Sequence, residues 1–126
     1  EFPRIHPGMQ GLPYRYQYSL GSTATPVQGE VPAQDQIVKH DLTTGARTIH
    51  QLKAGQEADE AMFVPDPQGK GEDEGWLLAY VFDHADNKSH LVVLDATDVE
   101  APPVARVILP TRVPHGFHGD FAPLST

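Results

Sequence analysis

The sequence predicts an all-β fold in which short antiparallel strands follow one another as a meander. Twelve prolines and 11 glycines interrupt the 126 residues, and this frequency of breaks leaves little room for long helices. From Ile37 onward, short runs of β-branched and aromatic residues alternate with turn residues. Strands at this spacing build a sandwich, a barrel or a propeller, and the pattern alone leaves all three architectures open.

Each expected strand is a short run of this kind that ends at a polar turn. In chain order, the expected strands are residues 14–21, 36–41, 46–52, 61–66, 76–83, 89–96 and 104–110. The turn TTG between QIVKHD and ARTIHQL predicts a hairpin of 36–41 with 46–52. WLLAYVFD, residues 76–83, is apolar at nearly every position, as is typical of a strand covered on both faces. The interval 37–83 matches the size of one propeller blade.

The length of the chain suits one domain, and its charge excludes several classes of function. Seventeen acidic residues against nine basic ones give a net charge of −8, without any basic cluster that would attract nucleic acid. No apolar run approaches the length of a membrane span, and no signal peptide is apparent, so we expect a soluble, cytoplasmic protein. Because the chain has no cysteine, any metal must be held by histidine, aspartate or glutamate.

Two histidines, His115 and His118, stand three residues apart in the glycine-rich segment VPHGFHGDF. From spacing alone, this pattern favours a hydrogen-bonded turn histidine over a metal ligand, and two imidazoles are too few for a closed site. Four further histidines lie beside polar residues at expected strand ends or turns, and we expect them to be solvated: His40, His50, His84 and His90.

Two groups of carboxylates are further candidates for a functional role. The run EDE, residues 72–74, lies in the polar loop 67–75 and is most simply a solvated acidic turn. Glu60 directly precedes the expected strand AMFV, where an inward-facing carboxylate would need a partner such as a histidine N–H. On the residues alone, a surface position for Glu60 is favoured.

Taken together and in order, the motifs of the chain resemble those of one family. They are EFPRI, GLPYRYQYSLG, KHDLTTG, ADEAMFVPDP, EDEGWLLAYVFD, SHLVVLDATD, ARVILP and VPHGFHGDF. This set is similar to the C-terminal portion of the carotenoid oxygenase family, over Glu1 to Phe121. The family includes carotenoid and apocarotenoid cleavage dioxygenases, lignostilbene dioxygenases and the retinoid isomerase of the visual cycle.

The resemblance implies that the antiparallel meander forms the C-terminal blades of a seven-bladed β-propeller. In this family, a non-haem Fe(II) on the propeller axis is held by four histidines, three of which have glutamates in hydrogen-bonding positions behind them. The family's terminal FHG segment corresponds to residues 117–119, so the resemblance assigns His118 as a metal ligand. His115 occupies a position that resembles a variable one.

The resemblance also assigns roles to two glutamates. Glu60 corresponds to the glutamate of a GE(P/A)xFVP motif, although Asp59 stands where the family has glycine. By similarity, Glu60 accepts the Nδ1–H of His118, whereas Glu1 of EFPRI orients an iron histidine that lies upstream of this chain. Such carboxylates fix the tautomer of each imidazole and raise its basicity.

The implied activity is the oxidative cleavage of a conjugated C=C bond by O2, which gives carbonyl products. The substrate would be a small apolar conjugated molecule, such as a carotenoid, an apocarotenoid or a stilbene. Phe2 and Phe117 are expected either to line its tunnel or to pack in the core. An isomerase with the same iron site, and a non-catalytic β-propeller fragment that serves as a binding or assembly module, remain as alternatives.

The chain supplies one of the four expected histidines, and we expect the other three on an upstream propeller segment. We therefore expect residues 1–126 to be a C-terminal fragment of a propeller. Within it, residues 1–35 form a loop-rich first segment, and residues 36–126 carry the propeller strands.

Overall fold

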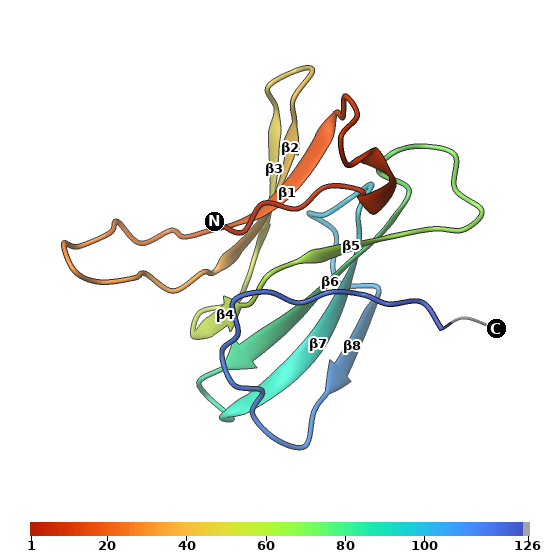
Figure 1. Cartoon of the computed structure of the whole chain (residues 1–126). Coiled ribbons are helices and arrows are strands. Elements are labelled where there is room, and N and C mark those ends of the chain that lie inside the picture. The colour runs from red at the N-terminus through yellow and green to blue at the C-terminus, as the bar shows by residue number, and fades with distance from the viewer. Residues whose placement is uncertain (125–126) are drawn as a thin grey trace.

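The computed structural model describes residues 1–124, which form eight strands and one 3-10 turn, η1 (Pro7–Met9) (Figure 1). The strands are β1 (Tyr16–Gly21), β2 (Gln36–Asp41), β3 (Arg47–Gln51), β4 (Gln56–Ala58), β5 (Met62–Pro65), β6 (Gly75–Asp83), β7 (Lys88–Asp95) and β8 (Ala105–Ile108). No α-helix occurs in residues 1–124, and no helix there has the length and apolar character needed to cross a membrane. The prediction of an all-β fold is confirmed.

The strands form two antiparallel sheets (Figure 1). The three-stranded sheet has the order β1-β2-β3, and its β2–β3 pair is the hairpin predicted around TTG. The five-stranded sheet has the order β4-β6-β7-β8, with β5 also paired to β6. Residues 37–83, although they match one blade in size, are divided between the two sheets, because β2 and β3 pair with β1 whereas β4 to β6 belong to the other sheet.

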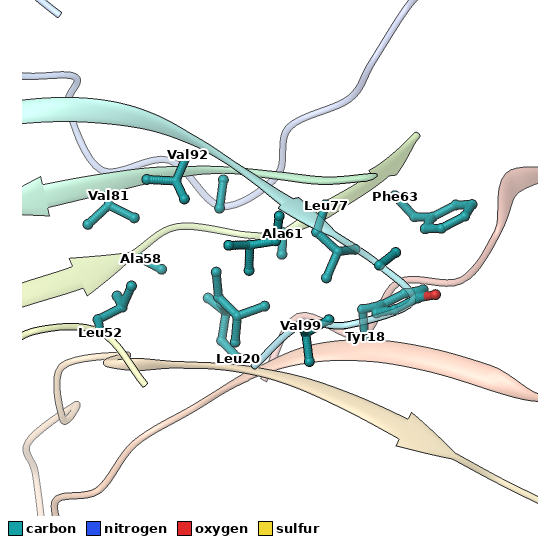
Figure 2. Packing of buried hydrophobic residues seen from close by; sticks show 14 residues of the cluster. Tyr18, Leu20, Leu52, Ala58, Ala61, Phe63, Leu77, Val81, Val92 and Val99 are labelled. Atoms are coloured by element: carbon teal, nitrogen blue, oxygen red, sulfur yellow. The ribbon is translucent and has the colours of Figure 1, made fainter. Parts of the chain in front are cut away.

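The core lies between the two sheets, where the inward side chains of both meet (Figure 2). β6 shows the alternation of a sheet with one packed face, since Leu77, Ala79 and Val81 are buried. On its other face, Tyr80 is 37% exposed. Phe82 on that face is buried, so the expectation that β6 is covered on both faces is met in full for one face and in part for the other. At one end of the core, the rings of Tyr18 and Phe63 stack with centroids 5.3 Å apart.

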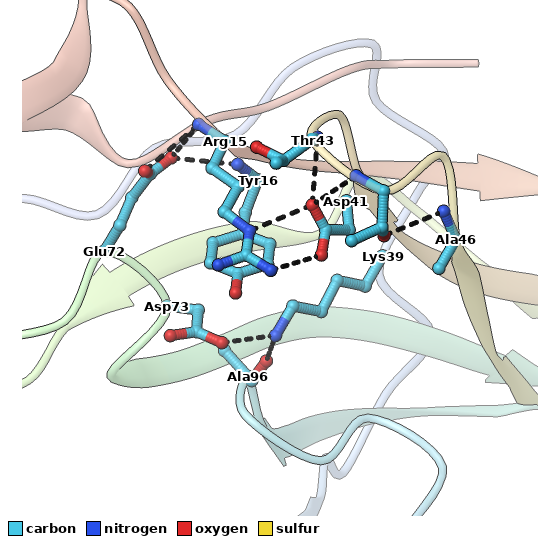
Figure 3. Close-up of polar contacts among 10 residues, drawn as sticks. Arg15, Tyr16, Lys39, Asp41, Thr43, Ala46, Glu72, Asp73 and Ala96 are labelled. Atoms are coloured by element: carbon cyan, nitrogen blue, oxygen red, sulfur yellow. Dashed lines mark hydrogen bonds and ion pairs between the residues drawn. The ribbon is translucent and has the colours of Figure 1, made fainter.

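The polar loop 67–75, which carries the run EDE, connects the two sheets through its carboxylates (Figure 3). Lys39 of β2 is buried, and its Nζ donates to Asp73 at 2.6 Å and to the carbonyl of Ala96 at 2.8 Å. The Glu72 carboxylate accepts the backbone N–H groups of residues 15 and 16, just before and at the start of β1. Glu74 accepts N–H groups within its own loop. The expectation of a merely solvated acidic turn is therefore wrong.

After β8 the chain turns back and crosses the five-stranded sheet without regular structure (Figure 1). The N–H of Val113 donates to Ser89 Oγ of β7 at 2.8 Å, which fixes the start of this crossing. We call residues 111–121 the crossing segment. It brings the two histidines of VPHGFHGDF beside the residues that connect β4 and β5.

Candidate functional site

The site is built where the crossing segment passes over an acidic stretch, Glu57 to Glu60. Glu57 lies in β4, and Asp59 and Glu60 follow in the short link to β5. The backbone of the link remains paired, since the N–H of Asp59 donates to the carbonyl of Tyr80 at 2.9 Å. Asp59, where the sequence departs from the family motif, therefore does not prevent the link from pairing with β6.

Glu60 is an inward-facing carboxylate, since its side chain is only 5% exposed. Its Oε1 lies 3.4 Å from His118 Nδ1, and its Oε2 accepts the N–H of Gly119 at 2.9 Å. Arg4 supplies the balancing charge, with Nε 3.5 Å from Glu60 Oε1. These partners offset the cost of burying the Glu60 carboxylate. The carboxylate in turn holds the crossing segment through the side chain of His118 and the backbone N–H of Gly119.

Arg4 also holds the crossing segment, through Gly119 and Asp120. It donates to the carbonyl of Gly119 at 2.6 Å and reaches Asp120 at 3.3 Å, while its own backbone pairs with Tyr18 of β1. Arg4 is a residue of the site that has no distinctive motif of its own in the sequence. The only local signal was a cation between apolar residues in EFPRI, and its partner Glu60 is far away in the sequence.

His118 turns one nitrogen to the protein and leaves the rest of its ring open, since its side chain is 74% exposed. With Nδ1 beside the Glu60 carboxylate, the hydrogen bond is satisfied by the Nδ1–H tautomer, which leaves the Nε2 lone pair unprotonated. The edge of the ring meets Phe2, with centroids 5.8 Å apart. Phe2 has a left-handed backbone with φ of 51°, a strained conformation for an aromatic residue.

Glu1 is held by its backbone. Its amino group donates to the carbonyl of Leu20 at 2.6 Å, and its carbonyl accepts the N–H of Leu20 at 2.8 Å. Its carboxylate has no hydrogen-bond or ion-pair partner within residues 1–124. The structure therefore brings together Glu60 and His118 of the predicted site, but it pairs the Glu1 side chain with neither of them.

His115 lies among carboxylates. Its Nε2 is 3.0 Å from Glu57 Oε1, and its Nδ1 is 3.4 Å from Asp59 Oδ1. The ring also meets the edge of Phe82 at 6.4 Å between centroids. Sequence reasoning gave His115 no role, because its partners lie more than fifty residues away and leave no local signal.

Three of the four histidines expected to be solvated are held by the protein instead. His90 is buried in β7, His50 Nδ1 lies 2.8 Å from the carbonyl of Val99, and His40 Nε2 lies 2.8 Å from Ser19 Oγ. His84 is exposed, as expected. Of the two phenylalanines considered for a tunnel, Phe2 packs partly buried against the core, whereas Phe117 is 81% exposed.

Within the described residues, no group of three or more histidine, aspartate and glutamate side chains is arranged to hold a metal ion. His118 nevertheless has the properties of a single ligand within a larger set, because its imidazole is oriented by a buried carboxylate and its Nε2 faces outward. Chemically, the residues present can provide one oriented nitrogen donor.

Comparison with known proteins connects this geometry to one family. The model of the retinal pigment epithelial membrane protein family matches residues 1–123. The chain is 41% identical over 122 residues to the apocarotenoid-15,15'-oxygenase of Synechocystis sp., covering 97% of this chain and 24% of that protein. It is 37% identical over 124 residues to a carotenoid cleavage oxygenase of Mycobacterium tuberculosis, with 98% and 24% covered. The chain thus spans about a quarter of the length of the relatives it matches.

Solved structures agree on the fold. A mutant and a cobalt-substituted form of the Synechocystis apocarotenoid oxygenase each superpose with a TM-score of 0.89 at 37% identity, over 97% of this chain and 25% of that one. That enzyme is a seven-bladed β-propeller. A quarter of seven blades is roughly two sheets, in keeping with the two sheets found here. The predicted propeller architecture is confirmed.

Proposed function

Because the chain belongs to the carotenoid oxygenase family, we propose that it forms part of a non-haem Fe(II) dioxygenase. The enzyme would cleave a conjugated C=C bond of a carotenoid, apocarotenoid or stilbene-type substrate with O2, giving carbonyl products. The observation that carries this proposal is the contact between Glu60 and His118, which the family resemblance led us to expect.

In this proposal His118 is a metal ligand through Nε2. Glu60 accepts the Nδ1–H, holds the ring in one tautomer and makes the imidazole a better donor. Its second oxygen binds Gly119, so the backbone next to the ligand is fixed as well. The bound Fe(II) would supply the centre at which O2 is activated. The residues of this chain would orient the His118 imidazole and keep its proton on Nδ1, so that Nε2 is free to bind the metal.

The remaining parts of the site would lie outside these residues. We propose that an upstream propeller segment carries three further iron histidines, one of which is oriented by Glu1. The free carboxylate of Glu1 within residues 1–124 supports this role, because it is available for a partner from elsewhere. The apolar conjugated substrate would be bound mainly by that upstream segment, with Phe2 and Phe117 near the metal.

A chimera tests the proposal. Residues 1–123 would replace the matching quarter of the Synechocystis apocarotenoid oxygenase, and the purified chimera would be assayed for iron and for apocarotenoid cleavage. We expect about one iron per chain and measurable cleavage. His118→Ala should lose both, whereas Glu60→Gln should lower metal affinity or activity by about 10- to 100-fold.

His84→Gln is the matched control, because His84 is exposed and belongs to the turn after β6. It should retain iron and activity. A chimera that folds but holds equal iron with and without His118 would remove His118 from the metal site. A chimera with iron but no carbonyl products would favour the isomerase or the non-catalytic module.

A further inference from the structure

The crossing segment has no regular secondary structure, yet it must hold His118 in a fixed place. It is anchored near Val113, at Gly119 and, between them, at His115. Val113 is tied to Ser89, and the guanidinium of Arg112 lies 4.2 Å from the ring centroid of Phe82. Gly119 is tied to Glu60 and Arg4. Between these two ends, His115 is the residue besides His118 itself whose side chain makes polar contacts with β4 and the link to β5.

His115 contacts two carboxylates through two different nitrogens. Nε2 lies 3.0 Å from Glu57, and Nδ1 lies 3.4 Å from Asp59. An imidazole can meet a different partner with each of its two ring nitrogens. His115 therefore spans the side chain of Glu57 in β4 and that of Asp59 in the link to β5.

The other contacts of Glu57 and Asp59 also point to His115 as their main partner. Glu57 and Asp59 pair with no lysine or arginine in the described part of the chain. Their ion-pair partners in that part of the chain are histidines, namely His115 for both and His84, which lies 3.6 Å from Glu57. Removing His115 would leave neighbouring like charges without their shared donor, at the point where the crossing segment meets the sheet.

The distance along the chain makes this anchor relevant to His118. Three residues span at most about 10 Å when extended, so a ring fixed at position 115 limits how far His118 can move from Glu60. We propose that His115 is a positioning residue, which clamps the crossing segment to Glu57 and Asp59 and thereby keeps His118 against Glu60. The inference rests on the proposed role of His118, although the contact itself needs no metal.

The test follows two signals of the segment in the 126-residue chain by NMR. The first is the hydrogen exchange of the Gly119 amide, which Glu60 protects; the second is the ring nitrogen shifts of His118, which report its tautomer. We expect His115→Ala to speed exchange at Gly119 by about fivefold or more and to reduce the Nδ1–H tautomer. Exchange of the β6 amides, which lie in the core, should stay unchanged.

Two variants complete the design. His115→Arg places several donors in a fork at this position, and it should restore both signals to near the wild-type values. His84→Gln removes the other histidine beside Glu57 but lies outside the crossing segment, and it should change neither signal.

Two outcomes would overturn the proposal. One is Gly119 exchange in His115→Ala within about twofold of wild type. The other is equal acceleration at Gly119 and in β6, since His115 would then stabilise the whole fold rather than place His118. If iron content in the chimera does not depend on His118 while Gly119 still depends on His115, the proposed function falls and the clamp stands.

Discussion

Glu60 and His118 are 58 residues apart in sequence, yet Glu60 Oε1 lies 3.4 Å from His118 Nδ1. The carboxylate is buried and the imidazole is largely exposed. This asymmetry suits a ligand held from behind, because the orienting group is shielded from water while the free nitrogen faces outward. It also makes Glu60 a structural joint, since the same carboxylate meets Arg4 and Gly119.

Replacement of Glu60 by alanine is expected to lower stability. The change leaves the N–H of Gly119 without its acceptor and takes one carboxylate from Arg4, for a cost of about 1–3 kcal/mol in the free energy of unfolding. Urea denaturation measures this difference. Glu30→Ala is the control, since Glu30 is exposed, and its effect should stay within about 0.5 kcal/mol. Equal losses in the two variants would show that the contacts of Glu60 with Arg4 and Gly119 do not stabilise the fold.

Replacement of Lys39 by methionine tests the link between the sheets. Methionine keeps most of the side-chain volume but removes the donor to Asp73 and to the carbonyl of Ala96. Asp73 is partly exposed, so we expect a loss of about 1–3 kcal/mol rather than the larger cost of breaking a fully buried pair. In urea denaturation, Lys88→Met on an exposed site should be near neutral. Adding Asp73→Asn to Lys39→Met should cost little more, because the pair is already broken.

The sequence pattern predicted strands well where side chains alternate or run apolar, as in β2, β6 and β7. It missed β4, because QEA has none of the β-branched or aromatic residues that mark a strand. It also could not divide the strands between two sheets. β4 pairs with the end of β6, and its Ala58 N–H donates to the carbonyl of Gln34. The formation of β4 and its place in the sheet therefore both depend on residues that are distant in the sequence.

The same limit applies to polar groups. The run EDE looked solvated because its cationic partner, Lys39, is 34 residues away from Asp73. The contact between Glu60 and His118 was expected from the family motifs, not from spacing. His115 fell outside those motifs, so its position beside Glu57 was visible only in the folded chain.

Gly75, at the start of β6, is a position where a side chain does not fit. A Cβ there would lie 2.3 Å from the carbonyl oxygen of Val64 and 2.9 Å from the ring of Phe63. Gly75→Ala must push β5 away from β6, and we expect a cost of about 1–3 kcal/mol in urea denaturation. Gly116→Ala is the matched control, since nothing lies within 4 Å of its added Cβ. A Gly75→Ala chain as stable as the control would mean that β5 shifts freely.

His40 predicts how stability depends on pH. Burial, with a smaller contribution from Arg47, lowers the pKa of His40 below the ordinary value of 6.5. The unfolded chain therefore takes up the proton at a higher pH than the folded chain does. The stability that depends on a neutral His40 is fully present above pH 6.5. It is lost as the pH falls from there towards the lowered pKa of His40 in the folded state.

His40→Gln removes this titration and can keep a hydrogen bond to Ser19. Between about pH 7.5 and about pH 5, the variant should lose less unfolding free energy than the wild type does. Urea denaturation at several pH values gives the two slopes. Gly116→Ala, which removes no titratable group and has open space for its Cβ, should keep the wild-type slope. If His40→Gln also keeps it, the proton uptake that weakens the fold in this range belongs to another group.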